Sequence, residues 1–549
     1  MIKPVFSLLV LLAACSSETT VTASLGSDKP PAAVPAAPAM TAGDLAEKYR
    51  AGDLTVEEAV QAYLDRIAAL DDQGPALQAV LTLNPNALED ARAVDAEAAE
   101  TGWRGPLHGV PVLIKDNVET LDMPTTAGSR ALSDNMTERD APIVARLRAE
   151  GAIILGKTNL SEWANFRSED SISGWSGLGG QTRNPYSLDR SPCGSSSGSG
   201  AAAAAMLAPL TIGTETNGSI ICPSTMNGIV GFKPTVGLLP RTHIVPISST
   251  QDTAGPMTRS VRDAAIMLTA MAGTDEVDTA SADSDSNKTD YAAALTDDLT
   301  GVRIGVMRFA TGDVPEVSAA FDEALSVLEE AGAVLVDVEK KDTPDDLGAN
   351  EYLVLKAEFK ATLNDYLANA APGVESRSLA DLIAFNDADE RELVLFDQSI
   401  FTQSEELPGL EDETYQTALA SILKATREDG IDDMLTSNDV DVLVAPTLPA
   451  AFLIDAVYGD NYDNKGVGLG WMAAIAGYPH ITVPMGSHRG LPVGLSVMAG
   501  KWQDTDVLNV GYNYEQRSEK IMTPTFARGP MDVEATSAAV TTWQDTDGQ

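Results

Sequence analysis

Short apolar runs alternate with helical and glycine-rich segments along this chain, and the alternation limits the folds open to it. The runs stand at residues 110–114, 152–155 and 207–212, and again at 302–306, 333–338 and 440–445, with a helical segment at 319–330. Continuous apolar runs of this length indicate strands that are buried on both faces. Alternating strands and helices predict an α/β fold in which helices cover both faces of one sheet. We find no internal repeat and no domain boundary after residue 41, so we expect a single large domain.

The N-terminus has the pattern of an export signal. MIKPVFSLLVLLAACSSE carries one cation, Lys3, before an apolar run over residues 5–14 and then Cys15. The run is too short to cross a bilayer core of ~30 Å as a helix, so residues 1–14 are predicted to be a signal peptide. Its ending, LAAC, resembles a bacterial lipobox, in which the cysteine becomes the lipidated first residue. A plain secretory signal with a chance cysteine is the alternative.

These signals predict where the protein resides. A lipid on Cys15 would anchor the protein to a membrane surface without a spanning helix. The residue after this cysteine is Ser16 and not an aspartate, which favours sorting to the outer membrane. We therefore expect an exported lipoprotein at the periplasmic face of the cell envelope.

Three further segments follow the signal. Residues 15–40 are rich in Ser, Thr, Ala and Pro and predict a flexible tether. Residues 41–530 form the predicted folded domain, and residues 531–549 a loose acidic tail. Near the start of the domain, Thr55 and Glu58 fit a capping box that precedes apolar residues at helical spacing.

The charge of the chain excludes one class of partner. Its 80 acidic residues against 37 basic ones give a formal net charge of −43. This field repels nucleic acid and anionic lipid, so a polyanionic partner is not expected. Partners are instead predicted to be a small molecule or a peptide, with a membrane reached only through the lipid anchor at Cys15. Nothing in the sequence specifies an oligomeric state.

The remaining cysteines and histidines do not have the spacing of metal ligands, and neither a metal nor a cofactor is expected. Cys193 and Cys222 could form a disulfide in an exported protein. Both stand in small-residue segments that are predicted to be buried, and two packed thiols are the favoured interpretation.

Two familiar motifs match the residue letters of this sequence, but the structural context that each motif needs is not predicted. GAIILGKT, residues 151–158, fits the phosphate-binding loop, but its intervening Ala-Ile-Ile-Leu predicts a buried strand instead of exposed amides. GSSSG, residues 194–198, fits the nucleophile elbow of α/β-hydrolases. The elbow needs a strand before the serine, and DRSPC is a poor strand. It also needs a later histidine, and His243, His480 and His488 each favour a structural role.

A lysine can replace histidine as the base if burial lowers its pKa toward neutrality. Lys115 ends the apolar run at 110–114, so its ammonium is expected to be partly desolvated, although a snorkelling lysine at a strand end is the alternative. Ser195 and Ser219 lie in two glycine-rich segments. Gly218 permits the backbone to turn successive N–H groups toward one point, which is the geometry of an oxyanion hole.

Lys115 in GVPVLIKDN, Ser195 in PCGSSSGSG and Ser219 in TETNGSI together resemble the amidase signature family of Ser–cis-Ser–Lys hydrolases. The resemblance extends through GKTNLSEWANFRS, GGQTRNPY, GIVGFKPTVGLLPR and QDTAGPMTRSVRDAA, and more weakly through the C-terminal part. It implies a mixed β-sheet core covered by helices on both faces. In detail the motifs are most similar to those of bacterial peptide amidases, which hydrolyse the C-terminal amide of peptides. Asn217 departs from the aspartate that peptide amidases tend to carry, which leaves substrate choice open.

The resemblance also implies a mechanism. Neutral Lys115 accepts a proton from Ser195, which follows a cis peptide bond, and Ser195 in turn accepts the proton of the nucleophile Ser219. The backbone N–H groups of Thr216, Asn217, Gly218 and Ser219 meet the tetrahedral oxyanion, a contact worth roughly 3 kcal/mol per donor. The acyl-enzyme on Ser219 is then hydrolysed by water.

The implied activity is hydrolysis of the C–N bond of carboxamides, with C-terminal peptide amides or related acyl amides as substrates and ammonia or an amine as product. An esterase or aryl-acylamidase activity on the same scaffold is the alternative. Less favoured are a Ser-His-Asp enzyme of the α/β-hydrolase type, a non-catalytic binding protein and a component of a transamidation complex. The last would require tRNA and a cytoplasmic partner, which the predicted signal and the negative charge oppose.

Overall fold

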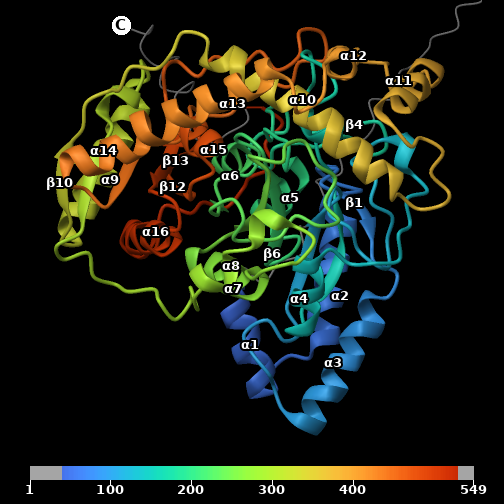
Figure 1. The fold of residues 1–549 in the computed structure, drawn as a ribbon. Helices are drawn as coiled ribbons and strands as arrows, with labels where there is room; N and C mark the ends of the chain where they lie inside the picture. Colours follow the sequence, from blue (N-terminus) through green and yellow to red (C-terminus); the bar gives the residue numbers. More distant parts are fainter. Residues whose placement is uncertain (1–39, 530–549) are drawn as a thin grey trace, which may run out of the picture. The chain divides into compact units, whose positions relative to one another are not determined.

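A computed structural model describes residues 40–529 of the chain (Figure 1). The predicted signal at 1–14, the predicted tether except for Met40, and the predicted tail at 531–549 lie outside the described residues. Within residues 40–529, no helix is both long and apolar enough to cross a membrane.

The centre of the domain is one mixed sheet of eleven strands. Their order is β1-β3-β2-β6-β8-β7-β12-β13-β11-β9-β10, with parallel pairs at β2–β3, β2–β6, β9–β10 and β9–β11. The strands are β1 (Val80–Leu83), β2 (Pro111–Lys115), β3 (Ile153–Thr158), β6 (Leu210–Glu215), β7 (Val230–Lys233), β8 (Thr253–Thr258), β9 (Arg303–Val306), β10 (Val334–Asp337), β11 (Val442–Pro446), β12 (His480–His488) and β13 (Leu491–Met498). A separate pair joins β4 (Trp175–Ser176) and β5 (Gly180–Gln181). The predicted mixed sheet is confirmed, and each predicted strand lies within a few residues of an observed one.

The described residues also form α-helices. They are α1 (Ala42–Ala51), α2 (Val56–Leu70), α3 (Ala87–Thr101), α4 (Pro142–Ala149), α5 (Ser197–Ala204), α6 (Ile221–Met226), α7 (Val261–Met271), α8 (Ser284–Asn287), α9 (Pro315–Glu330), α10 (Leu347–Ala368), α11 (Leu379–Ala388), α12 (Ser399–Glu406), α13 (Glu413–Thr426), α14 (Asp432–Asn438), α15 (Gly470–Ala476) and α16 (Asp504–Ser518). The predicted capping box is present at α2, where the Thr55 side chain accepts from the Glu58 N–H and the Glu58 carboxylate accepts from the Thr55 N–H.

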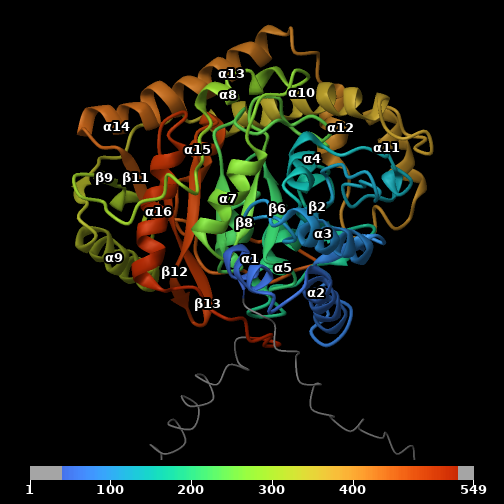
Figure 2. The same cartoon turned by 90° about the horizontal axis from the view of Figure 1, so that it is seen from below.

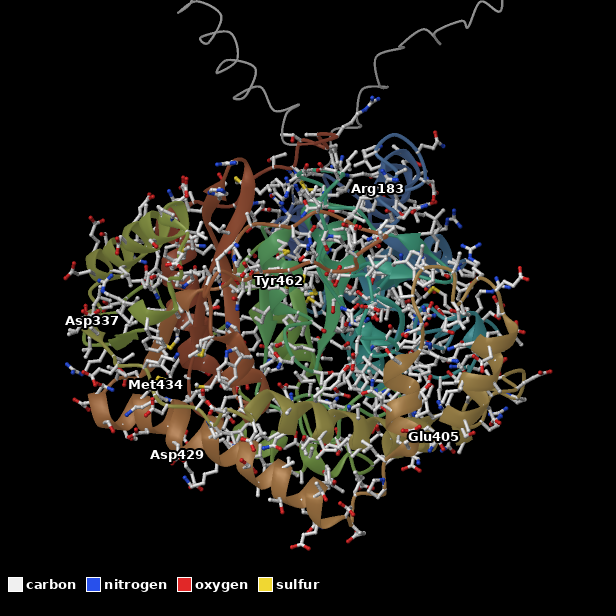
Figure 3. All side chains as sticks on the ribbon, turned by 90° about the horizontal axis from the view of Figure 1, so that it is seen from above. Arg183, Asp337, Glu405, Asp429, Met434 and Tyr462 are labelled. Carbon is white, nitrogen blue, oxygen red and sulfur yellow. A yellow bond between two sulfur atoms is a disulfide. The ribbon has the colours of Figure 1, made fainter. Side chains whose placement is uncertain are left out.

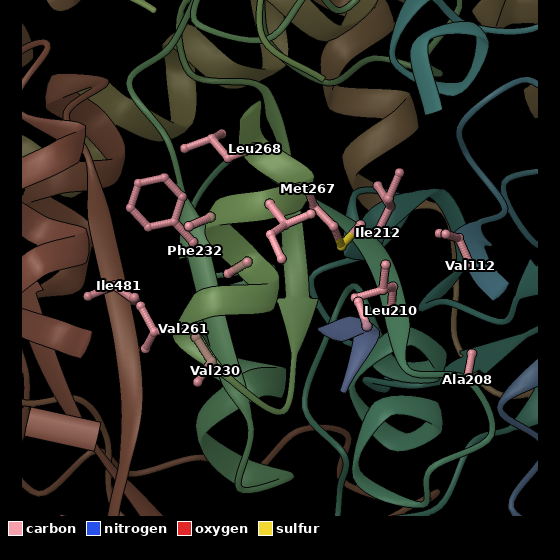
Figure 4. Packing of buried hydrophobic residues seen from close by; sticks show 14 of the residues in the cluster. Val112, Ala208, Leu210, Ile212, Val230, Phe232, Val261, Met267, Leu268 and Ile481 are labelled. Atoms are coloured by element: carbon pink, nitrogen blue, oxygen red, sulfur yellow. The ribbon is translucent and has the colours of Figure 1, made fainter. Parts of the chain in front are cut away.

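Helices cover both faces of the sheet. Helix α16 contacts both α7 and α9, and the three helices pack on β7, β8, β12 and β13. Figure 4 shows part of this interface, where Val261, Met267 and Leu268 of α7 pack over strand residues such as Ile212 and Phe232. Thr211 points the other way, because its hydroxyl reaches the carbonyl of Ser199 in α5. The short helices α5 and α6 therefore cover the opposite face, as predicted.

A group of helices between residues 347 and 438 lies across one end of the central strands. Helices α10 and α13 pack along each other, and α10 also contacts α11 and α12 (Figure 2). The sequence did not single out these helices. On the outside of the domain, acidic side chains such as Asp337 and Asp429 point into solvent (Figure 3). The apolar faces of the helices point inward, toward the sheet or toward each other.

Candidate active site

The site forms where two parallel strands end together. Lys115 is the last residue of β2 and Glu215 the last of β6. These strands are hydrogen-bonded neighbours, with Ile114 opposite Ile212, so their carboxyl ends reach the same edge of the sheet. Ser195 lies in the turn that leads into α5, and Ser219 in the turn between β6 and α6. Three segments that are far apart in sequence thus meet at this edge.

Lys115 is fully buried and hydrogen-bonded to the predicted relay serine. Its Nζ lies 2.8 Å from Ser195 Oγ, 2.8 Å from Thr214 Oγ1 and 3.3 Å from the Thr214 carbonyl. Burial lowers the pKa of Lys115 to about 7, against the opposing influence of the Asp252 and Glu215 carboxylates. The peptide bond between Gly194 and Ser195 is cis. This lysine can therefore be neutral at physiological pH and accept a proton.

The two serines belong to segments that touch. The N–H of Ser196 donates to the Ser219 carbonyl at 3.2 Å, which ties the two turns together. Within the described residues no hydrogen bond joins Ser219 Oγ directly to Ser195 Oγ. Ser195 is fully buried and Ser219 remains 8% exposed, so only the second can meet a molecule from outside.

The loop over residues 216–219 presents backbone donors. Its four N–H groups have no hydrogen-bond acceptor within residues 40–529. Gly218 has a φ of +82°, a left-handed conformation that residues with a side chain disfavour. The position that a Cβ atom would take faces open space. Beyond the loop, Glu215 Oε2 accepts from the N–H groups of Ile220 at 2.8 Å and Ile221 at 3.0 Å. The loop can thus offer several free N–H groups to an anionic oxygen.

Two carboxylates from other segments accept hydrogen bonds from side chains of this loop. Thr216 Oγ1 donates to Asp252 at 2.6 Å, and Asn217 Nδ2 donates to Glu351 Oε1 at 2.6 Å. Gln251 bridges the two contacts, donating to the Thr216 carbonyl at 3.3 Å and to Glu351 at 3.2 Å. Burial raises the pKa of both Asp252 and Glu351. Gln251 and Asp252 had no predicted role beyond membership of a motif, and Glu351, in α10, belonged to no motif.

The expectation of two separate thiols is wrong. Cys193 and Cys222 form a disulfide, with their Cα atoms 5.9 Å apart. Both residues are buried in small-residue segments as predicted, but the turn before α5 and the helix α6 pack against each other and bring the two sulfurs together. The bond joins the residue two positions before Ser195 to the residue three positions after Ser219.

Neither letter-only motif match forms the kind of site that its pattern names. Residues 153–158 form the buried strand β3, and Lys157 pairs with Asp116 at 3.0 Å, so this segment is a strand as predicted. Of the histidines, His480 Nε2 contacts Ser496 Oγ at 2.7 Å, while His243 and His488 approach Glu119 and Glu316. No histidine in the described part of the chain bonds Ser195 or Ser219.

Two cavities border the loop. One of about 520 Å³ is lined by Asn117, Thr214 and Thr216, with the segment 241–249 and part of α10. The other, of about 260 Å³, is lined by Gly194, Asn217, Gly218 and the disulfide. The described residues contain no group of histidine, cysteine and acidic side chains that could hold a metal ion.

Comparison with known proteins identifies the family. The amidase family model matches residues 58–508. The chain belongs to the amidase family. It is 37% identical over 491 residues to a probable amidase of Arabidopsis thaliana, covering 87% of this chain and 89% of the relative. It is also 36% identical over 492 residues to one component of the glutamyl-tRNA(Gln) amidotransferase of Moorella thermoacetica, covering 87% of this chain and 97% of that component.

Among solved structures, the fold is similar to that of peptide amidases. The native peptide amidase from Stenotrophomonas maltophilia is 46% identical, with a TM-score of 0.84, and the match covers 89% of this chain and 98% of that one. A peptide amidase in complex with the competitive inhibitor chymostatin is 47% identical, with a TM-score of 0.85, and the match covers 88% of this chain and 99% of that one. The predicted family and fold are confirmed, and the chain is an amidase that hydrolyses amide C–N bonds.

The Asn217–Glu351 contact generates a prediction about this amidase. Asn217→Asp places a second carboxylate beside Glu351, and repulsion between them shifts the loop, so we expect kcat/KM at pH 7 to fall about tenfold (about 1.4 kcal/mol). Adding Glu351→Gln supplies an amide donor to the new carboxylate and restores most of the loss. Ammonia release by the two single variants and the double variant measures this coupling. Wild-type activity in Asn217→Asp would show that the contact does not position the loop.

The disulfide generates a second prediction. Replacing both cysteines, Cys193→Ser with Cys222→Ser, frees a closed loop of about thirty residues in the unfolded chain and should lower the free energy of unfolding by about 3 kcal/mol. Denaturant titration under non-reducing conditions measures this difference. Wild type in a strong thiol reductant is the control and should match the double variant. An unchanged midpoint in both would mean that the bond contributes nothing to stability.

Proposed function

We propose that this amidase hydrolyses C-terminal carboxamides of peptides through an acyl-enzyme on Ser219, releasing ammonia. The observation that carries the proposal is the buried contact between Lys115 and Ser195 beside a loop of free N–H groups. The similarity to peptide amidases at 46–47% identity supports the choice of substrate class.

The roles follow from the chemistry of each group. Neutral Lys115 takes a proton from Ser195, and Ser195 takes the proton of Ser219, whose oxygen forms a bond to the amide carbon. The carbonyl π electrons move to its oxygen, and the N–H groups of residues 216–219 stabilise that negative charge. The C–N bond then breaks, and the nitrogen leaves as ammonia with the proton returned through Ser195. A water molecule repeats the sequence on the ester, which yields the peptide acid and free Ser219.

The first test measures ammonia released from an N-acetylated dipeptide amide. Wild type should turn the substrate over, whereas Ser219→Ala and Lys115→Ala should each lose at least about 10³-fold in kcat, because each breaks the relay. Circular dichroism melting confirms that the variants fold. Unchanged turnover by Ser219→Ala would refute the nucleophile, and hydrolysis confined to an anilide or an ester would replace the peptide-amide assignment with the aryl-acylamidase or esterase alternative.

The pH dependence tests the base. Only neutral Lys115 accepts a proton, and its pKa is about 7, so kcat/KM should rise as pH increases through about 7 and level off above it. A lysine with its ordinary pKa would give a rate that still rises about tenfold per pH unit between roughly pH 8 and 9. Initial rates from mildly acidic to mildly basic pH, with enzyme stability checked at each pH, distinguish the two profiles.

We also propose that the chain is exported and lipidated at Cys15. The support is the sequence of residues 1–16 alone, which lies outside the described residues. Intact mass of the protein purified from membranes should show a diacylglyceryl addition on Cys15 and loss of residues 1–14. The Cys15→Ala variant should leave the membrane fraction, and a wild-type protein without added lipid mass would contradict the anchor.

A further inference from the structure

The cavity of about 260 Å³ beside the loop has an unusual set of polar atoms in its wall. We call it the acceptor pocket and define it by Asn165, Glu215, Leu448, Tyr462, Trp471 and His480. Four of these residues carry a buried polar atom that has no hydrogen-bond partner within residues 40–529: Asn165 Oδ1, Glu215 Oε1, Tyr462 Oη and His480 Nδ1. Glu215 is 2% exposed and His480 is fully buried. Buried polar groups are normally paired, so four unpaired ones around one cavity indicate that a ligand binds there.

Asn165 and Glu215 present acceptors. The amide nitrogen of Asn165 donates to Ser173 Oγ at 3.2 Å, which leaves its oxygen as the unpaired atom. Glu215 accepts two backbone N–H groups on Oε2 and none on Oε1. A carboxylate or amide oxygen can only accept hydrogen bonds, so each of these atoms requires a donor from the ligand.

His480 presents a third acceptor. Ser496 Oγ donates its single proton to Thr447 Oγ1 at 3.0 Å, so it must accept from His480 Nε2, which lies 2.7 Å away. Burial, with the charge of Lys233, lowers the pKa of His480 to about 3, so the ring is neutral. Its Nδ1 therefore carries a lone pair and can only accept a hydrogen bond. The hydroxyl of Tyr462 can donate or accept, and Figure 3 labels this residue near the middle of the domain.

The wall also has an apolar part, beside the polar residues Ser173, Thr447 and Asn464. Leu448, Val467, Trp471 and the disulfide supply the apolar part. A cavity of this size is smaller than the roughly 300–1,000 Å³ of a typical small-molecule site, and suits one side chain. A wall with an apolar part and several acceptors fits a side chain that has an apolar stem and an N–H or O–H donor.

The position of the pocket indicates which part of the substrate enters it. The pocket borders Gly194, Asn217 and Gly218, the residues next to the relay serine and the nucleophile. The leaving group of a primary amide is only ammonia, which is far too small to fill such a cavity. The acyl part must therefore occupy it.

We propose that the acceptor pocket binds the side chain of the residue that carries the scissile amide and selects side chains with a hydrogen-bond donor, such as those of tyrosine, glutamine and lysine. This inference rests on the proposed function, because it assumes a peptide amide as substrate. A donor satisfies acceptors that otherwise stay buried and unpaired, which is unfavourable. An isostere without a donor leaves them unpaired and is rejected.

The test compares N-acetyl-alanyl-X-amides in matched pairs: tyrosine with phenylalanine, glutamine with methionine, and lysine with norleucine. Ammonia release gives kcat/KM for each. We expect the donor-bearing member of each neutral pair to be favoured about tenfold or more. The lysine pair distinguishes a cationic donor from a neutral one, and both belong to the proposed class.

Variants tie the preference to the pocket. Tyr462→Phe and Asn165→Leu each remove a polar atom from the wall, so the ratio of kcat/KM for the tyrosine substrate to that for the phenylalanine substrate should fall toward one. Tyr458→Phe is the matched control, because Tyr458 is 78% exposed and does not line the pocket, and it should keep the wild-type ratio. If kcat/KM falls for both substrates and their ratio is unchanged, the two residues have a merely structural role and the inference is overturned.

The outcomes separate the two proposals. Hydrolysis of all six amides with equal kcat/KM in every pair would refute donor selection while leaving the peptide amidase function intact. Selectivity that follows the amine in a series of substituted anilides, and not residue X, would assign the pocket to the leaving group and also refute the inference. If no peptide amide is hydrolysed, the proposed function fails and the inference fails with it.

Discussion

The parallel pairing of β2 with β6 is the constraint on which the rest of the site depends. It brings the end of β2, with Lys115, beside the end of β6, from which the loop at 216–219 departs. Helices on both faces then exclude water from the lysine, and burial lowers its pKa to about 7. An exposed lysine would be protonated at that pH and could not take a proton from Ser195. The chemistry of the site therefore follows from its place inside a doubly covered sheet.

Long-range contacts fix the parts that the sheet does not hold. Asp252 comes from the segment before β8 and Glu351 from α10, yet both reach the loop through the side chains of Thr216 and Asn217. The disulfide ties the segment before Ser195 to α6. These restraints leave the four N–H groups of the loop free, because the positioning contacts are made to its side chains and its backbone carbonyls. A loop held in this way can be rigid and still offer unpaired donors.

The strands and the three principal residues were accessible from the sequence for physical reasons. Apolar runs predict buried strands, so β2, β3 and β6 were found within a few residues. Lys115 stands at a strand end, and Ser195 and Ser219 stand in distinctive glycine-containing turns. Glu351 could not be predicted in the same way, since a glutamate on a helix with an indistinct apolar face gives no sign of its partner. The disulfide was misjudged because burial of two cysteines predicts nothing about their separation in space.

The sequence by itself therefore determined the family and the mixed α/β fold and singled out the lysine and the two serines as candidates, since local pattern and motif order carry that information. Only the tertiary structure decided that Cys193 bonds Cys222, that Asn217 faces Glu351, and that four unpaired polar atoms surround one cavity. Each of these depends on side chains from segments far apart in the chain, and their contacts exist only once helices and strands have packed.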